Sequence, residues 1–251
     1  MKIALIGRGR LATNLLPALH KAGHEVTSVN SRTLEELPAQ ADVYIISVKD
    51  SALQEVIDKA CKGKESQCFV HTAGSMPMRI FEGHCQHYGV FYPMQTFSKE
   101  RQVDFHEIPI FIEEQASQGV LRRLAESISA NVFELSTEQR KYLHLAAVFA
   151  CNFTNHCYTL SAAVLAHVNL PFDVMLPLID ETARKVHELH PLDAQTGPAV
   201  RFDENVIKMQ MTLLEDPAMR VIYEKMSQSI HKTAIENHDQ LRLREDKSHR
   251  V

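Results

Sequence analysis

The sequence predicts an α/β fold, in which a doubly wound and mostly parallel sheet is followed by an all-helical C-terminal domain. Three observations support this prediction. A short apolar strand at the N-terminus leads into a glycine-rich turn and a helix. Short apolar segments then alternate with helical segments, which is the alternation that builds a parallel sheet with helices on both faces. Strand signals stop near Ser136, so we expect two domains, residues 1–135 and 136–251.

The N-terminal region contains seven segments with the apolar character of strands. Residues 42–48 are almost continuously apolar, as in a strand that is buried on both faces. Besides the helix after the glycine-rich turn, we expect helices over residues 51–60 and 114–129. The expected strands are residues 2–7, 25–30, 42–48, 67–71, 88–92, 108–112 and 132–135.

The C-terminal region shows only helical patterns. We expect a long helix over residues 137–167, with Ser136 or Thr137 as its N-cap. Further helices are expected over residues 171–187 and 203–242, with a polar loop between them.

The first turn of the chain has the pattern Gly-x-Gly-x-x-Ala. Gly7 would make the tight turn, Gly9 would let a pyrophosphate approach the backbone, and Ala12 would let the helix pack close to the strand. Free N–H groups at the start of the helix would hold the phosphates. The pattern predicts a Rossmann dinucleotide-binding domain; the alternative is an α/β domain whose glycines only make a turn. The residues expected to contact the cofactor here are Gly7, Arg8, Gly9, Arg10, Leu11 and Ala12.

The end of the second strand indicates which dinucleotide is bound. NAD-specific sites usually place Asp or Glu there to bind the ribose 2′-OH. This chain has Asn30, Ser31 and Arg32 instead. Arg32 can hold a 2′-phosphate with two donors and Ser31 can add a hydroxyl, so we expect NADP(H) as the cofactor. The alternative is that Arg32 is only a solvated surface residue.

Loops that follow the next strands carry further polar residues. In this topology ligands bind outside the carboxyl ends of the strands. We therefore expect these loops to line the nicotinamide or substrate pocket, the alternative being that they form only caps and turns. The residues in question are Ser47, Val48, His71, Thr72, Gly74 and Ser75.

The long helix carries a polar stripe within an otherwise apolar segment. At about 100° per residue, Lys141, His144, Asn152 and Asn155 fall on one face. Unpaired buried polar groups are costly, so a ligand cleft between the domains would explain the stripe. We expect Lys141 or His144 to donate a proton and an asparagine to orient the substrate. The alternative is a histidine that is satisfied in the core, with asparagines bonded to neighbouring helices. The flanking apolar residues, from Leu143 to Ala150, are expected to be buried.

Composition excludes several classes of protein. The net charge of −4 gives no basic surface for nucleic acid, and no apolar run approaches the ~18 residues of a membrane span. The five cysteines are scattered without a Cys-x-x-Cys pair, which favours free thiols in a cytoplasmic protein. Histidine is abundant, and His84-Cys85-x-His87 could suggest a metal, but no second ligand pair stands at zinc-like spacing, so we expect no metal.

Taken together, these motifs resemble a family of small bacterial Rossmann-like NADP oxidoreductases, whose helical half is a domain of unknown function. The resemblance covers nearly the whole chain. It implies an NADP-binding domain, an all-helical domain for substrate binding and dimerisation, and a homodimer through the helices. The motifs are Gly7-x-Gly9-x-x-Ala12, Asn30-Ser31-Arg32, His71-Thr72-Ala73-Gly74-Ser75, Tyr92-Pro93-Met94-Gln95-Thr96-Phe97, the segment from His144 to Phe153, and Thr196-Gly197-Pro198.

More distantly, the layout is similar to pyrroline-5-carboxylate reductase, to 6-phosphogluconate and β-hydroxyacid dehydrogenases, and to ketopantoate reductase. The chain departs from the β-hydroxyacid dehydrogenases at their Lys-x-x-x-Asn pair, because Leu145 stands four residues after Lys141. The sequence thus favours NADP(H)-dependent reduction of a small carbonyl or imine acid by hydride transfer at the interdomain cleft. The alternative is a non-catalytic NADP(H)-binding or redox-sensing module, which would need no proton donor.

Overall fold

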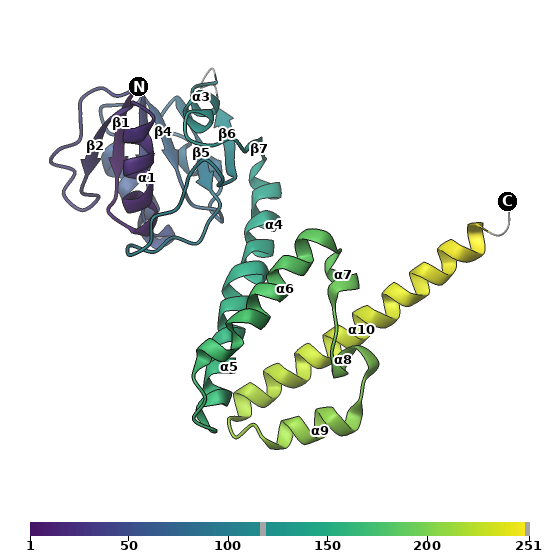
Figure 1. The fold of residues 1–251 in the computed structure, drawn as a ribbon. Helices are drawn as coiled ribbons and strands as arrows, with labels where there is room; N and C mark the ends of the chain where they lie inside the picture. Colours follow the sequence, from purple (N-terminus) through teal and green to yellow (C-terminus); the bar gives the residue numbers. More distant parts are fainter. Residues whose placement is uncertain (116–118, 249–251) are drawn as a thin grey trace. The chain divides into compact units, whose positions relative to one another are not determined.

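The computed structural model describes residues 1–115 and 119–248, with side chains described as far as residue 238. The chain forms two compact units, Met1–Asn152 and Phe153–Val251 (Figure 1). The last strand ends at Glu134, close to the predicted domain boundary. The boundary between the two compact units lies 18 residues further on, after Asn152. The predicted division of roles between 1–135 and 136–251 stays a prediction.

The first unit is built on one seven-stranded sheet of order β2-β1-β3-β4-β5-β6-β7. Every neighbouring pair is parallel except β5 and β6, which run antiparallel. The prediction of a mostly parallel, doubly wound sheet is therefore confirmed. The strands are β1 Lys2–Ile6, β2 Glu25–Val29, β3 Val43–Ile46, β4 Cys68–His71, β5 His87–Pro93, β6 Ile110–Gln115 and β7 Val132–Glu134.

Helices cover both faces of this sheet and divide its core in two. One cluster packs Leu15, Ile45 and Phe91 on one side, and the other packs Tyr44 and Phe69 on the opposite side. All four residues of β3 are buried, as the continuous apolar run predicts. The helices of this unit are α1 Arg10–Lys21, α2 Asp50–Ala60, the short 3₁₀ helix η1 Met78–Phe81, α3 Val120–Glu126 and α4 Thr137–Ala147.

The expected helix over residues 114–129 is wrong in its first part. Residues 114 and 115 still belong to β6, and α3 begins only at Val120. Gly119 precedes it with φ +72°, a left-handed conformation that a helix interior excludes. The Glu114 carboxylate accepts the backbone N–H groups of Gly119 and Arg122, and so holds the start of the helix. Residues 116–118 lie outside the described part of the chain.

Two sets of contacts fix the start of α4. Ser136 is its N-cap and forms a capping box with Gln139, so one of the two predicted caps is confirmed. One turn on, Arg140 is 1% exposed and its guanidinium pairs with the carboxylate of Glu113 on β6. The same guanidinium donates to the Met76 carbonyl at 2.7 Å. Thr137 donates its backbone N–H and its hydroxyl to the same Glu113 carboxylate.

The chain stays helical beyond α4 but changes its period. A π-helical segment, η2 Val148–Phe153, precedes α5 Thr154–Ala166. A π-helix pairs residue i with i+5, so the 100° spacing used for the polar stripe does not hold past Ala147. The expected burial of the flanking apolar residues is also wrong: Leu145 is 53% and Phe149 is 62% exposed. Leu143 alone among them packs against a buried cluster, that of Tyr92.

The second unit is helical throughout its described part and buries few side chains. Its longest helix, α10, packs against α8 and α9. Large apolar side chains are exposed on several of its helices, including Leu178, Met209, Val221 and Met226. After α5 come the 3₁₀ helix η3 Phe172–Met175, α6 Leu176–Glu188, α7 Pro191–Ala194, α8 Pro198–Arg201, α9 Glu204–Thr212 and α10 Pro217–Ser248 (Figure 1). None of the described helices is both long and apolar enough to cross a membrane.

We predict that the Glu113–Arg140 pair contributes more to stability than any exposed ion pair of this unit. Glu113→Gln should lower the free energy of unfolding by about 3–5 kcal/mol, because it leaves a buried guanidinium without its counter-charge. Urea unfolding followed by circular dichroism measures this loss. The matched control is Lys141→Met, which breaks the exposed pair with Glu138 and should change the midpoint little. Equal effects of the two substitutions would contradict the prediction.

Candidate functional site

The carboxyl ends of the five parallel strands β1 to β5 meet at one edge of the sheet. Ligands of doubly wound sheets bind outside this edge, at the point where the strand order reverses. Here the reversal lies beside β1, because β2 is on one side of it and β3 on the other. The predicted cofactor residues follow β1, β2, β3 and β4 at this edge.

The glycine loop after β1 has the shape that a dinucleotide needs. Gly7 has φ +125°, and a Cβ there would lie 2.1 Å from the carbonyl oxygen of Ser47. A Cβ on Gly9 would meet nothing within 4 Å, so the space above it is open. Gly9 is the N-cap of α1, without a side-chain cap and without an acidic residue in the first turn. The first N–H groups of α1 are thus available to an anion, and the loop fits a pyrophosphate.

The other residues predicted to contact the cofactor at the start of α1 differ in how deeply they are buried. Ala12 is buried and lies in the core cluster below the helix, as close packing requires. Leu11 is half-buried against the same cluster. Arg8 and Arg10 are exposed, and Arg8 lies 3.9 Å from Glu36, an acidic neighbour that the sequence analysis did not consider.

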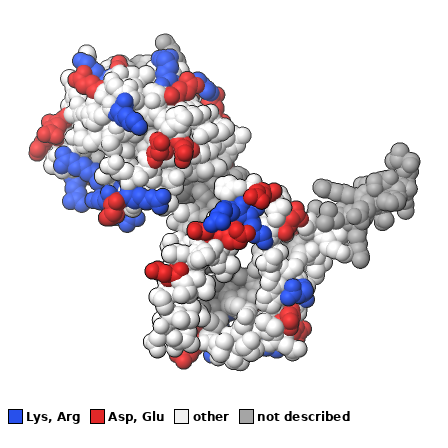
Figure 2. All heavy atoms as spheres, in the orientation of Figure 1, with Lys and Arg blue, Asp and Glu red and all other residues white. Residues whose placement is uncertain are grey.

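The end of β2 carries the three residues expected to select the cofactor. Arg32 is exposed, and its backbone N–H donates to Asn30 Oδ1 at 3.0 Å, which makes a tight turn. Ser31 is half-buried beside it. Figure 2 shows basic side chains gathered along the lower edge of the first unit in that view. The turn leaves the Arg32 guanidinium in solvent, where a 2′-phosphate can reach it.

Loops after β3 and β4 contribute backbone more than free side chains. Ser47 is buried, and its carbonyl lies directly beneath Gly7. Val48 borders the same glycine, and Thr72 is buried. The Ser75 hydroxyl donates to the Asp50 carboxylate at the start of α2. These residues support the glycine loop and the neighbouring turns at this edge of the sheet.

His71 lies inside the protein. It is fully buried, stacks on Phe81 with ring centroids 5.7 Å apart, and accepts the Ala73 backbone N–H on Nδ1 at 3.2 Å. Burial is the larger cause and the nearby charge of Arg140 the smaller one of a lowered pKa, which is about 4. His71 is therefore neutral at neutral pH and holds the turn that follows β4.

A cavity of about 510 Å³ lies where β5 ends beside α4. His144 and Asn152 both line it, together with Tyr92 and the residues that follow it. Gly9 and His71 are not among the residues that line it. The lining residues are Tyr92, Met94, Gln95, Thr96, Leu143, His144, Ala146, Ala147, Val148, Ala150, Cys151 and Asn152.

The remaining residues of the predicted stripe lie elsewhere. Lys141 is exposed and pairs with Glu138 at 2.7 Å, one turn away on the same helix. Asn155 belongs to the second unit and is exposed. Of the four stripe residues, the structure brings His144 and Asn152 together around one cavity.

Sequence reasoning missed the partner of His144. The Tyr92 hydroxyl lies 3.1 Å from His144 Nδ1, and the two rings meet edge to face. Gly74 makes this approach possible, because a Cβ there would lie 2.7 Å from His144 Nδ1 and 2.8 Å from the Tyr92 ring. Burial raises the pKa of Tyr92, while the charge of Arg140 acts in the opposite direction. A tyrosine at the end of a predicted strand was the available signal.

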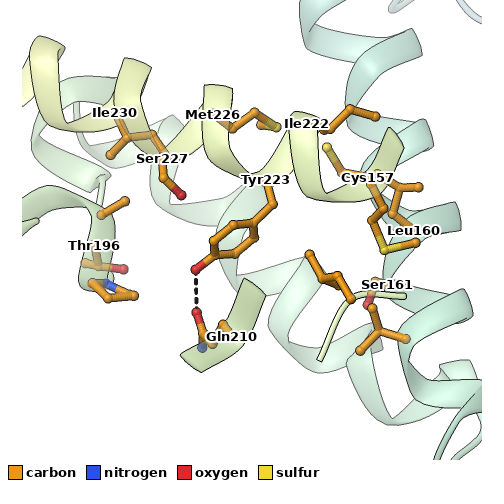
Figure 3. A pocket seen from close by; sticks show the side chains of 15 residues that line it. Cys157, Leu160, Ser161, Thr196, Gln210, Ile222, Tyr223, Met226, Ser227 and Ile230 are labelled. Atoms are coloured by element: carbon orange, nitrogen blue, oxygen red, sulfur yellow. Dashed lines mark hydrogen bonds between the residues drawn. The ribbon is translucent and has the colours of Figure 1, made fainter. Parts of the chain in front are cut away.

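The second unit has a cavity of its own, of about 400 Å³, between α5, α8, α9 and α10 (Figure 3). Its walls are mostly apolar, and Tyr223 points across it to donate to Gln210 Oε1 at 2.5 Å. Thr196 and Pro198 of the Thr196-Gly197-Pro198 motif line it as well. Among the residues with described side chains, no three His, Cys, Asp or Glu gather as metal ligands would.

Comparisons with known proteins agree with this architecture. Residues 2–61 match a family described as NADP oxidoreductase, coenzyme F420-dependent, and residues 108–230 match a domain of unknown function, DUF2520. A comparison with curated proteins found no match.

Three solved structures are similar over most of the chain. One is the crystal structure of a Bacteroides fragilis protein that is named as an NADP oxidoreductase. It is 52% identical, with a TM-score of 0.85, and the match covers 92% of this chain and 98% of that one. Two reductases share the fold at low identity. The NADP⁺ complex of a Myxococcus stipitatus imine reductase is 14% identical, with a TM-score of 0.64 and coverage of 96% and 95%. A 1-pyrroline-5-carboxylate reductase from Streptococcus pyogenes is 15% identical, with a TM-score of 0.60 and coverage of 92% and 98%.

The first of these relatives is similar enough, over enough of both chains, to show the family. The glycine loop and the sheet topology are features by which Rossmann domains bind a dinucleotide. The chain belongs to this family of NADP oxidoreductases, with an N-terminal NADP-binding domain and a C-terminal DUF2520 domain.

Proposed function

We propose that this enzyme uses NADPH to reduce the C=N or C=O bond of a small imine or carbonyl acid in the cavity beside His144. The observation that carries the proposal is the gathering of Tyr92, His144 and Asn152 around one cavity at the cofactor edge of the sheet. Bound NADPH would supply the hydride. A reduction of this kind also needs a proton donor beside the atom that gains negative charge, and His144 has that chemistry.

The direction in which the cofactor would lie supports this assignment. Its phosphates fit the open loop at Gly9, and its 2′-phosphate fits Arg32 at the end of β2. The nicotinamide half must then extend the other way, past β3 toward β4 and β5. The cavity begins at Tyr92, the residue before the end of β5. A nicotinamide on this path reaches the neighbourhood of His144.

The cavity wall favours a small substrate with an apolar body. Its exposed lining is mainly apolar, and its polar groups besides His144 and Tyr92 are the neutral side chains Gln95, Thr96 and Asn152. Amide and hydroxyl donors of this kind can hold a carboxylate or orient the reacting group. The names of two structural relatives, imine reductase and 1-pyrroline-5-carboxylate reductase, favour a C=N substrate over a C=O one.

We predict that His144 donates the proton. His144→Asn should lower kcat by about 10²–10⁴-fold, as expected for the loss of a general acid, and leave NADPH affinity within about twofold. NADPH oxidation with a panel of cyclic imines and 2-keto acids measures turnover, and NADPH fluorescence measures binding. Lys141→Ala is the control and should retain activity. Loss of activity in Lys141→Ala, with an active His144→Asn, would transfer the role to Lys141. A panel that gives no NADPH oxidation would favour the sensing module.

We predict that Arg32 selects NADPH over NADH. Arg32→Ala should weaken NADPH binding by about 10- to 160-fold, the equivalent of the ~1.5–3 kcal/mol of a charge-assisted contact, and leave NADH binding nearly unchanged. Fluorescence titration with both cofactors gives the ratio. Arg101→Ala, at another exposed arginine, is the control. Parallel losses for the two cofactors would refute the role of Arg32.

We also propose that a second copy of the chain covers the helices of the second unit. Exposed apolar side chains occur on α5, α6, α9 and α10, including Val164, Leu178, Met209 and Met226. A surface of this kind is rarely left in water, and symmetric pairing of identical patches is the commonest way to bury it.

The homodimer is tested by light scattering at micromolar concentration, where we expect twice the mass of the chain. Met226→Glu should shift the mass toward the monomer, because it places a charge in the apolar surface. Ser229→Glu adds the same charge to another exposed position of α10 and should leave the dimer intact. A monomeric wild-type protein would contradict this proposal.

A further inference from the structure

The contact between Tyr92 and His144 links the tautomer of the histidine to the direction of their hydrogen bond. Tyr92 is 9% exposed, and a hydroxyl buried to this extent needs a hydrogen-bond partner. Its hydrogen-bond partner is His144 Nδ1 at 3.1 Å. When the phenol donates there, Nδ1 holds a lone pair, so the neutral imidazole carries its hydrogen on Nε2.

We propose that Tyr92 is a positioning residue that holds His144 as the Nε2–H tautomer and restores the proton that His144 gives to the substrate. This inference rests on the proposed reduction beside His144. Beyond that reduction, it assigns the protonation state of His144 and the source of the proton that His144 regains.

Two features of the structure hold the pair in place. Gly74 lies against both rings, and any side chain there would separate them, since a Cβ would come within 2.8 Å of each. Arg140 stands one turn before His144 on α4, and its charge lowers the pKa of Tyr92 against the larger effect of burial. The guanidinium is itself fixed by Glu113 and the Met76 carbonyl. A fixed positive charge would therefore stabilise the phenolate when Tyr92 gives up its proton.

The proton transfer balances without further groups. The substrate carbon gains the hydride, and the electrons of the C=N or C=O bond move to its nitrogen or oxygen. That atom takes the proton from His144 Nε2, while Nδ1 takes the proton of the Tyr92 hydroxyl. The imidazole stays neutral in its other tautomer. The cycle closes when Nε2 takes a proton from water and Nδ1 returns its proton to the Tyr92 phenolate. The net change is the consumption of one NADPH, one substrate molecule and one proton.

The first test needs no substrate. Protein labelled with ¹⁵N-histidine is examined by NMR at pH 8, with His144→Asn used to assign the His144 signals. We expect wild-type His144 to be protonated on Nε2 with a hydrogen-bonded Nδ1. Tyr92→Phe should shift the Nδ1 signal, whereas the control Tyr88→Phe, on the same strand, should not. A proton on Nδ1 in the wild type, or a Nδ1 signal unchanged in Tyr92→Phe, would overturn the proposal.

The second test uses the pH dependence of turnover with a substrate found in the panel. Without the phenol, a neutral imidazole that gave up its proton would become an anion. A charged imidazolium, in contrast, gives up a proton and leaves a neutral ring. Tyr92→Phe should therefore lose about tenfold or more in kcat at pH 8 and less than about threefold at pH 6. Equal losses at both pH values would contradict the restoration of the proton by Tyr92. Gly74→Ala, which pushes the two rings apart, should reproduce the NMR shift if Tyr92→Phe fails to fold.

The two tests separate the two proposals. The expected NMR result without NADPH oxidation by any substrate would contradict the proposed reduction and leave the hydrogen bond established. Turnover that depends on His144, with the NMR result reversed, would support the reduction and overturn the role of Tyr92.

Discussion

The buried ion pair between Arg140 and Glu113 is the interaction on which the candidate site depends. Charges are buried in proteins only when they are paired and hydrogen-bonded, so this pair tolerates little displacement. It joins α4 to β6 and, through the Met76 carbonyl, to the segment after β4. His144 follows Arg140 by four residues and lies on the same face of α4, where it meets Tyr92. The Arg140–Glu113 pair thus fixes both the position of α4 and the contact between His144 and Tyr92.

The sheet arranges the rest of the site in a row. Parallel pairing sends the ends of β1 to β5 to one edge, with the phosphate loop after β1 and the Asn30-Ser31-Arg32 turn after β2. Small residues make the close approaches along this row. Gly7 lies on the Ser47 carbonyl, and Gly74 lies against Tyr92 and His144. The π-helical segment at the end of α4 adds Asn152 to the cavity, and such segments occur frequently at functional sites.

Local sequence signals predicted the parts of the structure that depend on near neighbours. The glycine loop, the buried strand at residues 43–46 and the Ser136 cap all follow from residues within one element. The contacts that define the cavity join residues far apart: Tyr92 and His144 are 52 positions apart, and Glu113 and Arg140 are 27 apart. Arg140 stands in a polar first turn, where a solvated side chain is the ordinary expectation. Neither its burial nor the π-helical change of period has a local signal.

The most direct test of this account is a crystal structure of the protein with NADP⁺ bound. We expect the 2′-phosphate at Arg32, the pyrophosphate on the N–H groups after Gly9, and the nicotinamide ring in the cavity wall beside Gly74 and Tyr92, with its C4 facing the space next to His144. A nicotinamide that lies outside this cavity, with His144 out of reach of any substrate on C4, would contradict the account.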